Sequence, residues 1–286
     1  MYDKRIQWLY TMIDTFLSVI RVLFQSQFRK TDTFIKKHKK CIVMGNGPSL
    51  IETLERIQDG FSNYDLIAVN HMAMTVQYER IKPSVYVLCD PAFWFAIGYE
   101  VPGEKARVMY QSMIEKTTWP LQVYIPNEAK KTNLRSLLEK NKNISLHFYN
   151  KTKFEGFKKV SHWIYKKQWG IPRAQNVLVA ALMLSIHSQY KEIFLAGADN
   201  DWIRNLWVDE KNRLRLNDIH YYKEEKNITE RILPILLHEQ CLSLYFVFKG
   251  YMDIKLYAEK RSTCIYNMNK RSFIDAFEKT ECSSIC

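Results

Sequence analysis

The feature that most constrains the fold is an alternation of short apolar runs with helical stretches from Lys40 onward. The spacing predicts strands at 41–44, 66–70, 85–89, 107–110, 123–125, 192–197 and 254–257. It predicts helices at 49–58, 70–80, 134–140, 176–186, 235–248 and 271–277. Continuous apolar strands that alternate with helices are typical of a mostly parallel sheet covered on both faces. We therefore predict an α/β, Rossmann-like fold with a mostly parallel sheet and helices on both faces.

The composition divides the chain into two parts. Residues 1–39 form a separate N-terminal segment, and we expect residues 40–286 to form a single domain. Within that domain the polar stretch 200–230 is predicted to be a long loop or a lid-like insertion. A length of 286 residues suits one large α/β domain of this kind.

The N-terminal segment is expected to be an amphipathic, basic helix. Its apolar residues recur at helical spacing, with charged residues such as Arg5, Asp14 and Arg21 between them. No run approaches ~20 uncharged residues, so the sequence does not predict a transmembrane span. A basic cluster follows at 29–40, which favours a peripheral position on an anionic membrane surface. The alternative is a helix that packs on its own domain or on another subunit of a homo-oligomer.

The net charge and the cysteines limit the classes of partner and the compartment that the sequence predicts. The net charge of +12 favours anionic partners, although an ordinary solvated surface has the same signature. The stretch 150–170 is basic and aromatic, but no RNA-binding signature accompanies it, so we predict no nucleic-acid partner. The six cysteines contain no CxxC pair and give no zinc spacing, which indicates a reducing, cytoplasmic compartment.

Polar residues follow four of the predicted strands where each strand ends. Ligands bind beyond the carboxyl ends of the strands in open α/β sheets, so these residues are the candidate site. At the first, Pro48 opens a helix, and the turn before it is expected to aim backbone N–H groups at a phosphate. That turn lacks the third glycine of a dinucleotide fingerprint and the lysine of a P-loop. The four strand ends are Gly45-Asn46-Gly47, Asn70-His71, Asp90-Pro91 and Gly197-Ala198-Asp199.

An asparagine offers a hydrogen-bond donor and an acceptor together, which suits recognition of a base or a sugar. Asn46 and Asn70 are therefore interpreted as ligand residues. Asp90 and Asp199 have an equally good alternative, since an aspartate commonly caps the helix that follows it. His71 follows a strand end and could touch a ligand.

Several segments, in order, resemble the bacterial lipooligosaccharide sialyltransferases, which are glycosyltransferase family 42. The resemblance spans roughly residues 40–277, and its most specific parts are the first strand end and the segment that ends at Asp199. The matching segments are Gly45-Asn46-Gly47-Pro48-Ser49-Leu50, Ala68-Val69-Asn70, Asp90-Pro91 with the aromatics that follow, Tyr190 to Asp199, Asn217-Asp218-Ile219-His220-Tyr221, and Ile254-Lys255-Leu256-Tyr257.

The resemblance implies an inverting transfer of an acidic sugar, sialic acid or a relative such as Kdo, from a CMP-activated donor. The acceptor would be a hydroxyl of a bacterial surface glycan, in lipooligosaccharide or polysaccharide assembly, and no cofactor or metal would be required. Residues 40–286 would then be a nucleotide-sugar-binding glycosyltransferase domain with a lid near 200–230. The membrane surface would be the inner face of the cell membrane, and the acceptor could be lipid-linked.

The resemblance also assigns residue roles. His220, beside Tyr221, is the candidate general base, because an imidazole titrates near working pH. Asn46 and Ser49 would hold the nucleotide, and Asn70 the nucleotide or the sugar. Gly45, Gly47, Gly197 and Asp199 complete the expected donor site. Asp90 stands where the family has an asparagine. Arg173 matches an arginine near the donor, Asn176 replaces a serine, and Trp202 and Trp207 fall near the two phosphate-binding tyrosines.

Other interpretations are open, two of them enzymes. Asp199-Asn200-Asp201 is formally a DxD, which holds a divalent ion in metal-dependent transferases that use nucleotide diphosphate sugars. A pyrophosphokinase of the archaeal pterin type also opens with a glycine-rich turn. Both would be nucleotide-dependent transferases on the same fold. A non-enzymatic, membrane-bound interaction protein is the third possibility.

Overall fold

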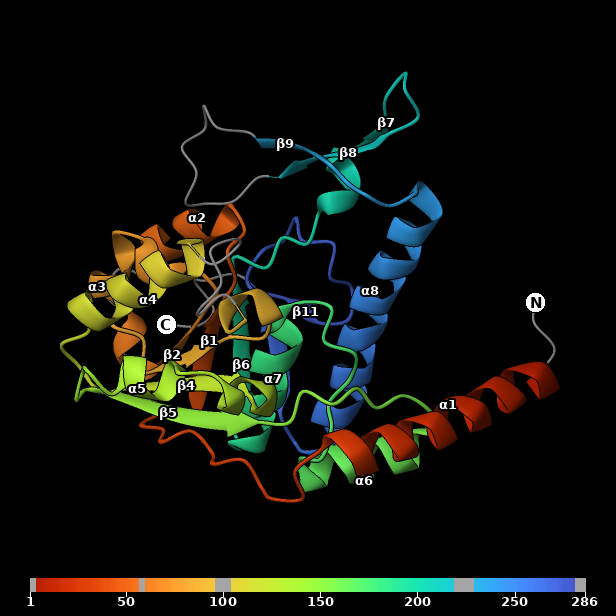
Figure 1. The fold of residues 1–286 in the computed structure, drawn as a ribbon, viewed down its shortest axis with the longest axis horizontal. Helices are drawn as coiled ribbons and strands as arrows, with labels where there is room; N and C mark the ends of the chain where they lie inside the picture. The colour runs from red at the N-terminus through yellow and green to blue at the C-terminus, as the bar shows by residue number, and fades with distance from the viewer. Residues whose placement is uncertain (1–3, 57–59, 96–103, 219–228, 281–286) are drawn as a thin grey trace.

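A parallel sheet of eight strands organises the described part of the chain in the computed structural model (Figure 1). The structure describes residues 4–56, 60–95, 104–218 and 229–280. The strands of this sheet are β1 Lys40–Met44, β2 Asp65–Val69, β3 Val85–Val87, β4 Leu121–Pro126, β5 Ile144–Tyr149, β6 Glu192–Ala196, β10 Cys264–Asn267 and β11 Glu278–Lys279. The helices are α1 Lys4–Gln25, α2 Ser49–Arg56, α3 Gln77–Ile81, α4 Glu104–Lys116, α5 Leu134–Leu138, α6 Lys158–Lys167, α7 Val177–His187 and α8 Leu237–Lys260.

Two apolar cores cover the two faces of the sheet. Because side chains alternate along a strand, Cys41 and Val43 of β1 join the core that includes α7 and α8. Ile42 and Met44 join the opposite core, which includes residues from α2 to α5. The helix α7 is apolar all round, and its residues from Val177 to Ile186 are buried. The expected α/β fold with helices on both faces is confirmed.

The order of the strands reverses at β1. The sheet reads β11-β10-β6-β1-β2-β3-β4-β5, so β1 pairs with β2 on one side and with β6 on the other. The chain runs outward from β1 to β5 and then returns to continue the sheet from β6. A reversal of this kind leaves a crevice outside the carboxyl ends of the two central strands, where α/β proteins bind ligands.

Three expected elements differ in the structure. Residues 107–110 lie in α4, whose buried Ala106, Met109, Tyr110 and Met113 recur at helical spacing. Residues 254–257 lie in α8 rather than in a strand. The expected helix at 271–277 is irregular backbone before β11. Short apolar runs fit a strand and a buried helix equally well, and only packing distinguishes them.

The stretch 200–230 contains a small antiparallel sheet rather than a long loop. Its strands are β7 Leu206–Val208, β8 Leu214–Asp218 and β9 Thr229–Ile232, in the order β7-β8-β9. The Asp209 carboxylate at the β7–β8 turn accepts hydrogen bonds from Arg213 and Arg215. The backbone N–H of Arg213, which also donates to this carboxylate, and then the two side-chain donors hold the pKa of Asp209 well below its usual range. Figure 1 shows this sheet apart from the main one.

The helix α1 is mostly exposed, with only Ser18 and Val22 buried. Among the described helices it is the one that is long and apolar enough to cross a membrane, by length and composition alone. The expected division of the chain at residue 39 stays a prediction.

Candidate ligand site at the carboxyl ends of the strands

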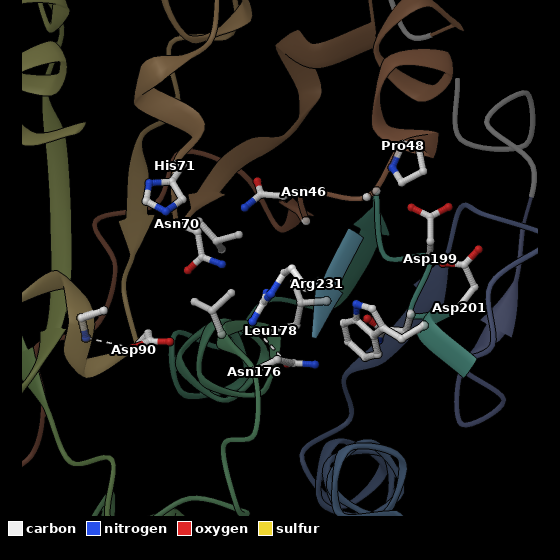
Figure 2. Close-up of a pocket in the computed structure, with 18 of the residues that line it drawn as sticks. Asn46, Pro48, Asn70, His71, Asp90, Asn176, Leu178, Asp199, Asp201 and Arg231 are labelled. Atoms are coloured by element: carbon white, nitrogen blue, oxygen red, sulfur yellow. Dashed lines mark hydrogen bonds between the residues drawn. The ribbon is translucent and has the colours of Figure 1, made fainter. Parts of the chain in front are cut away.

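A cavity of about 450 Å³ lies at the carboxyl ends of the central strands (Figure 2). The turns after β1, β2, β3 and β6 contribute to its lining, together with the N-terminus of α7 and residues of β8 and β9. Sequence-predicted residues that line it are Gly45, Asn46, Gly47, Asn70, His71, Asp90, Asn176, Gly197, Asp199, Asp201 and Trp202. The structure therefore brings the four predicted strand ends together.

The glycines of the first turn allow the turn after β1 to pack closely against the turn after β6. The N–H of Gly45 donates to the carbonyl of Ala196 (2.8 Å), and the N–H of Gly47 donates to that of Gly197 (2.9 Å). A Cβ on Gly45 would lie 2.4 Å from the Gly197 oxygen, and one on Gly47 would lie 1.8 Å from Asp199 Oδ2. The N–H groups of Gly45 and Gly47 are therefore not available to a phosphate, because carbonyls of β6 and of the turn after it accept them.

Asp199 fastens the start of α2. Its Oδ2 accepts hydrogen bonds from Ser49 Oγ (3.0 Å) and more weakly from Ser49 N (3.4 Å). Its Oδ1 accepts from Asn269 Nδ2 (2.6 Å). Burial raises the pKa of Asp199, although the bonds from Ser49 oppose the rise. Ser49 faces a second, smaller hollow rather than the main cavity, so the expected contact of Ser49 with the nucleotide is not seen in this geometry.

The DxD arrangement has limited capacity for a metal. Both carboxylate oxygens of Asp199 already accept protein hydrogen bonds, and Asp201 lines the cavity beside it. Among the described residues, no group of three or more histidine, cysteine or acidic side chains is placed to hold an ion.

The side-chain amide oxygens of Asn46 and Asn70 are the atoms of the cavity that point most directly to a ligand. The amide oxygen of each is buried and has no hydrogen-bond partner among the described residues. Figure 2 shows both side chains at the cavity, after β1 and β2. Asn70 has a left-handed backbone (φ 51°), which asparagine tolerates better than most residues. A buried acceptor without a partner is unfavourable by about 1–3 kcal/mol, which a ligand donor would recover.

Asp90 and His71 line the wall beyond Asn70. Asp90 Oδ1 accepts a hydrogen bond from Ala92 N (2.8 Å) and so caps the short helix Pro91–Phe93. The helix-cap alternative is thus present in the structure, and Asp90 lines the cavity as well. The rings of His71 and Phe93 are in contact, with centroids 5.0 Å apart.

Asn176 places the N-terminus of α7 at the cavity. Its Oδ1 accepts from the backbone N–H groups of Leu178 (3.1 Å) and Val179 (3.4 Å). Its Nδ2 donates to Tyr251 Oη (2.7 Å), which also accepts from Asn200 Nδ2 (2.6 Å). The positive end of the α7 dipole therefore faces the cavity and favours a negatively charged ligand group.

Two cations of the lining were missed by the sequence analysis. Lys105 comes from α4 and Arg231 from β9, far apart in the chain. Figure 2 shows Arg231 among the labelled cavity residues. No motif surrounds either residue, so only the tertiary structure could have identified them.

Other expected residues lie elsewhere. Arg173 does not line the cavity, because its guanidinium pairs with Glu155 (3.0 Å) and lies 3.5 Å from the ring centre of Phe246. Trp207 is partly exposed on β7 and is not part of the lining, unlike Trp202. His220 and Tyr221 lie outside the described residues.

The fold and the cavity define a Rossmann-like protein with a ligand site where the strand order reverses. The chain belongs to the 6-hydroxymethylpterin diphosphokinase MptE-like family, whose model matches residues 14–205. It is also similar in fold to the MAf glycosyltransferase from Magnetospirillum magneticum AMB-1, with a TM-score of 0.52 and 11% identity. That match covers 94% of this chain but 38% of the MAf chain. No curated protein matches the sequence.

These comparisons correct part of the sequence-based expectation. A glycosyltransferase-like fold is supported, while the family shown is MptE-like rather than the sialyltransferase family that the motifs resemble. The CMP-sugar specificity stays a prediction.

Proposed function

We propose that the chain is an inverting glycosyltransferase that moves an acidic sugar from a CMP-activated donor to a hydroxyl of a bacterial surface glycan. The observation that carries this proposal is the cavity with the two buried, unpartnered amide oxygens of Asn46 and Asn70 among the described residues. The name of the structural neighbour, a glycosyltransferase, supports the same class.

The cavity suits a mononucleotide with an acidic sugar. Its volume of about 450 Å³ lies within the range of small-molecule sites. Amide oxygens accept hydrogen bonds from the amino group of a cytosine or from ribose hydroxyls. The α7 N-terminus, Lys105 and Arg231 favour negative charge, which the phosphate and the sugar carboxylate of the donor supply.

In this reaction the acceptor oxygen attacks the anomeric carbon as the bond from that carbon to the phosphate oxygen breaks. CMP leaves with the bonding electrons, and the acceptor proton passes to a base. We assign His220 as that base from the sequence resemblance. Lys105 and Arg231 would stabilise the charge that develops on the leaving phosphate. No metal is required in this scheme.

A panel of CMP, CDP, UDP, GDP, ADP and ATP in thermal unfolding tests the nucleotide. A ligand that binds the native state raises the melting temperature, so CMP should produce the largest shift. Preference for a diphosphate would exclude the assigned donor. Transfer from CMP-linked acidic sugars should be lost in His220→Ala, while that variant keeps the thermal response to CMP.

The family match favours a second candidate, a diphosphokinase, in which a pterin hydroxyl attacks the β-phosphate of ATP, takes up the diphosphate group, loses its proton to a base and releases AMP. Such a reaction uses a divalent ion. Both carboxylate oxygens of Asp199 already accept protein hydrogen bonds, so Asp201 and Asp90 are the cavity carboxylates assigned to the ion. Stabilisation by ATP with Mg²⁺ that a chelator abolishes would select this candidate. The absence of any nucleotide response would favour a non-enzymatic interaction protein.

A further inference from the structure

The helix α1 exposes a large apolar surface. Phe16 is 64% exposed and Phe24 is 86% exposed, and Trp8 and Leu23 each exceed half. Isolated exposed apolar side chains are ordinary, but a contiguous set of large ones along one helix marks an interaction surface. Figure 1 shows the N-terminal half of α1 extending away from the rest of the molecule.

The angular width of the apolar surface around α1 indicates whether it fits a partner helix or a lipid phase. At 100° per residue, the exposed apolar side chains of α1 cover an arc of roughly 200° around the helix axis. Trp8 lies at one edge of this arc and Tyr10 at the other. A seam with one partner helix is narrower, because it uses about two positions in seven. Asp14 and Arg21 lie on a narrow strip between this arc and the body, and Arg5, in the first turn of the helix, is the charged residue inside the arc. An arc that covers more than half the helix fits a lipid phase better than one protein groove.

The opposite side of α1 is tied to the body by polar contacts. Thr15 Oγ1 accepts a hydrogen bond from the N–H of Phe157 (2.9 Å), and Ser18 Oγ accepts one from that of Glu155 (3.1 Å). Between them, a Cβ on Gly156 would lie 2.1 Å from Thr15 Oγ1, so the helix rests directly on backbone. A bilayer-spanning orientation would carry these polar contacts into hydrocarbon, which is unfavourable. The helix therefore suits a position along a surface.

Positive charge accompanies the apolar arc. Residues 4–40 carry nine lysines and arginines against two aspartates. The helix α6, which begins next to the Gly156 contact, carries four lysines and no acidic residue, and its Trp163 is 50% exposed. Basic residues beside an apolar helix are attracted to anionic lipid headgroups, while a second copy of this chain would bring like charge against them.

We propose that α1 is a membrane-surface helix, whose apolar arc inserts into the headgroup boundary of a bilayer that contains anionic lipid. The basic residues that follow α1 and those of α6 lie at the headgroups. This docking surface is independent of the cavity and of the reaction assigned to it. It would hold the catalytic domain on the membrane.

Sedimentation of the full chain with vesicles tests the proposal. Vesicles of phosphatidylcholine with phosphatidylglycerol should retain the protein, and phosphatidylcholine alone should retain far less. The double variant Phe16→Gln/Phe24→Gln should lose at least about tenfold in partitioning, because each side chain transfers a large apolar area. The control is Val76→Gln, which alters a side chain that is 84% exposed away from α1 and should leave partitioning unchanged. Thermal unfolding verifies that both variants are folded.

Three results would overturn the proposal. The first is equal retention by the two vesicle types, since charge would then have no part. The second is unchanged retention of the double variant. The third is absence of vesicle binding together with a concentration-dependent dimer that the double variant Phe16→Gln/Phe24→Gln abolishes. That result would show that the apolar arc of α1 binds a second copy of the chain.

Discussion

Asp199, in the turn after β6, caps the first turn of α2 although it lies 150 residues further along the chain, through hydrogen bonds from the hydroxyl and the backbone N–H of Ser49. A helix cap normally comes from the residue just before the helix. Here the cap joins β6 to the helix that follows β1, across the point where the strand order reverses. The carboxylate that resembles part of a metal site thus holds together the two turns that frame the cavity.

Asp199→Ala should therefore lower the free energy of unfolding by about 1–3 kcal/mol, because Ser49 and Asn269 lose a shared acceptor. Urea unfolding measures the change. Asp201→Ala is the matched control, since Asp201 lines the cavity two residues away and should have little effect on stability. Equal losses in the two variants would contradict the capping role.

Gly197→Ala should destabilise the protein by about 2 kcal/mol or more. The φ of Gly197 is +61°, and its Cβ would lie 2.7 Å from that of Leu50. Gly250→Ala in α8 is the control, because its Cβ would meet only ordinary contacts at 3.5 Å and beyond. That change should raise stability by about 0.5–1 kcal/mol through helix propensity. Thermal and urea unfolding of both variants test the contrast.

Asn46→Ala should weaken binding of the nucleotide that the panel selects by roughly tenfold, the equivalent of one lost hydrogen bond. It should not lower stability, because its buried amide oxygen has no partner among the described residues. Asn70→Gly makes the same test while it keeps the positive φ accessible. Calorimetric titration measures the affinity. Unchanged affinity in both variants would remove these residues from the ligand site.

Tyr251→Phe should lower the free energy of unfolding by about 1–3 kcal/mol, since Asn176 and Asn200 would both lose an acceptor. Burial raises the pKa of Tyr251 to about 12, so the neutral phenol is the relevant form. Tyr110→Phe is the control: Tyr110 is fully buried, but its hydroxyl has no partner among the described residues. That variant should be neutral or more stable in urea unfolding, and a loss equal to that of Tyr251→Phe would argue against the network.

Acid should destabilise the fold through His187. Burial lowers the pKa of His187 from its ordinary 6.5 to about 4. The folded state thus favours the neutral ring, and its contribution is complete above pH 6.5 and is lost as the pH falls toward 4. The loss should approach about 3 kcal/mol, at 1.36 kcal/mol per pKa unit. His187→Gln should flatten this dependence of the unfolding free energy on pH, and an unchanged pH dependence in that variant would contradict the assignment.

The main sheet could be predicted from the sequence largely because its strands are buried on both faces. Such strands are continuous apolar runs, as in β1, β2 and β6, and they are bounded by turn residues. Prediction was wrong at 107–110 and 254–257, where a short apolar run belongs to one side of a helix. The strand β5 was missed because His147 and Ser145 interrupt its apolar pattern.

The sequence by itself determined the parallel α/β fold, the four polar strand ends and the apolar character of α1. These follow from local patterns, since burial on both faces and helical periodicity leave a direct mark on residue order. Only the tertiary structure decided the roles within the site. In that structure Gly45 and Gly47 pack against backbone, and Arg173 pairs with Glu155 instead of lining the cavity. Lys105 and Arg231 line the cavity although no motif marks them. Which atoms are already satisfied depends on contacts between residues that are far apart in the chain, and no local pattern records them.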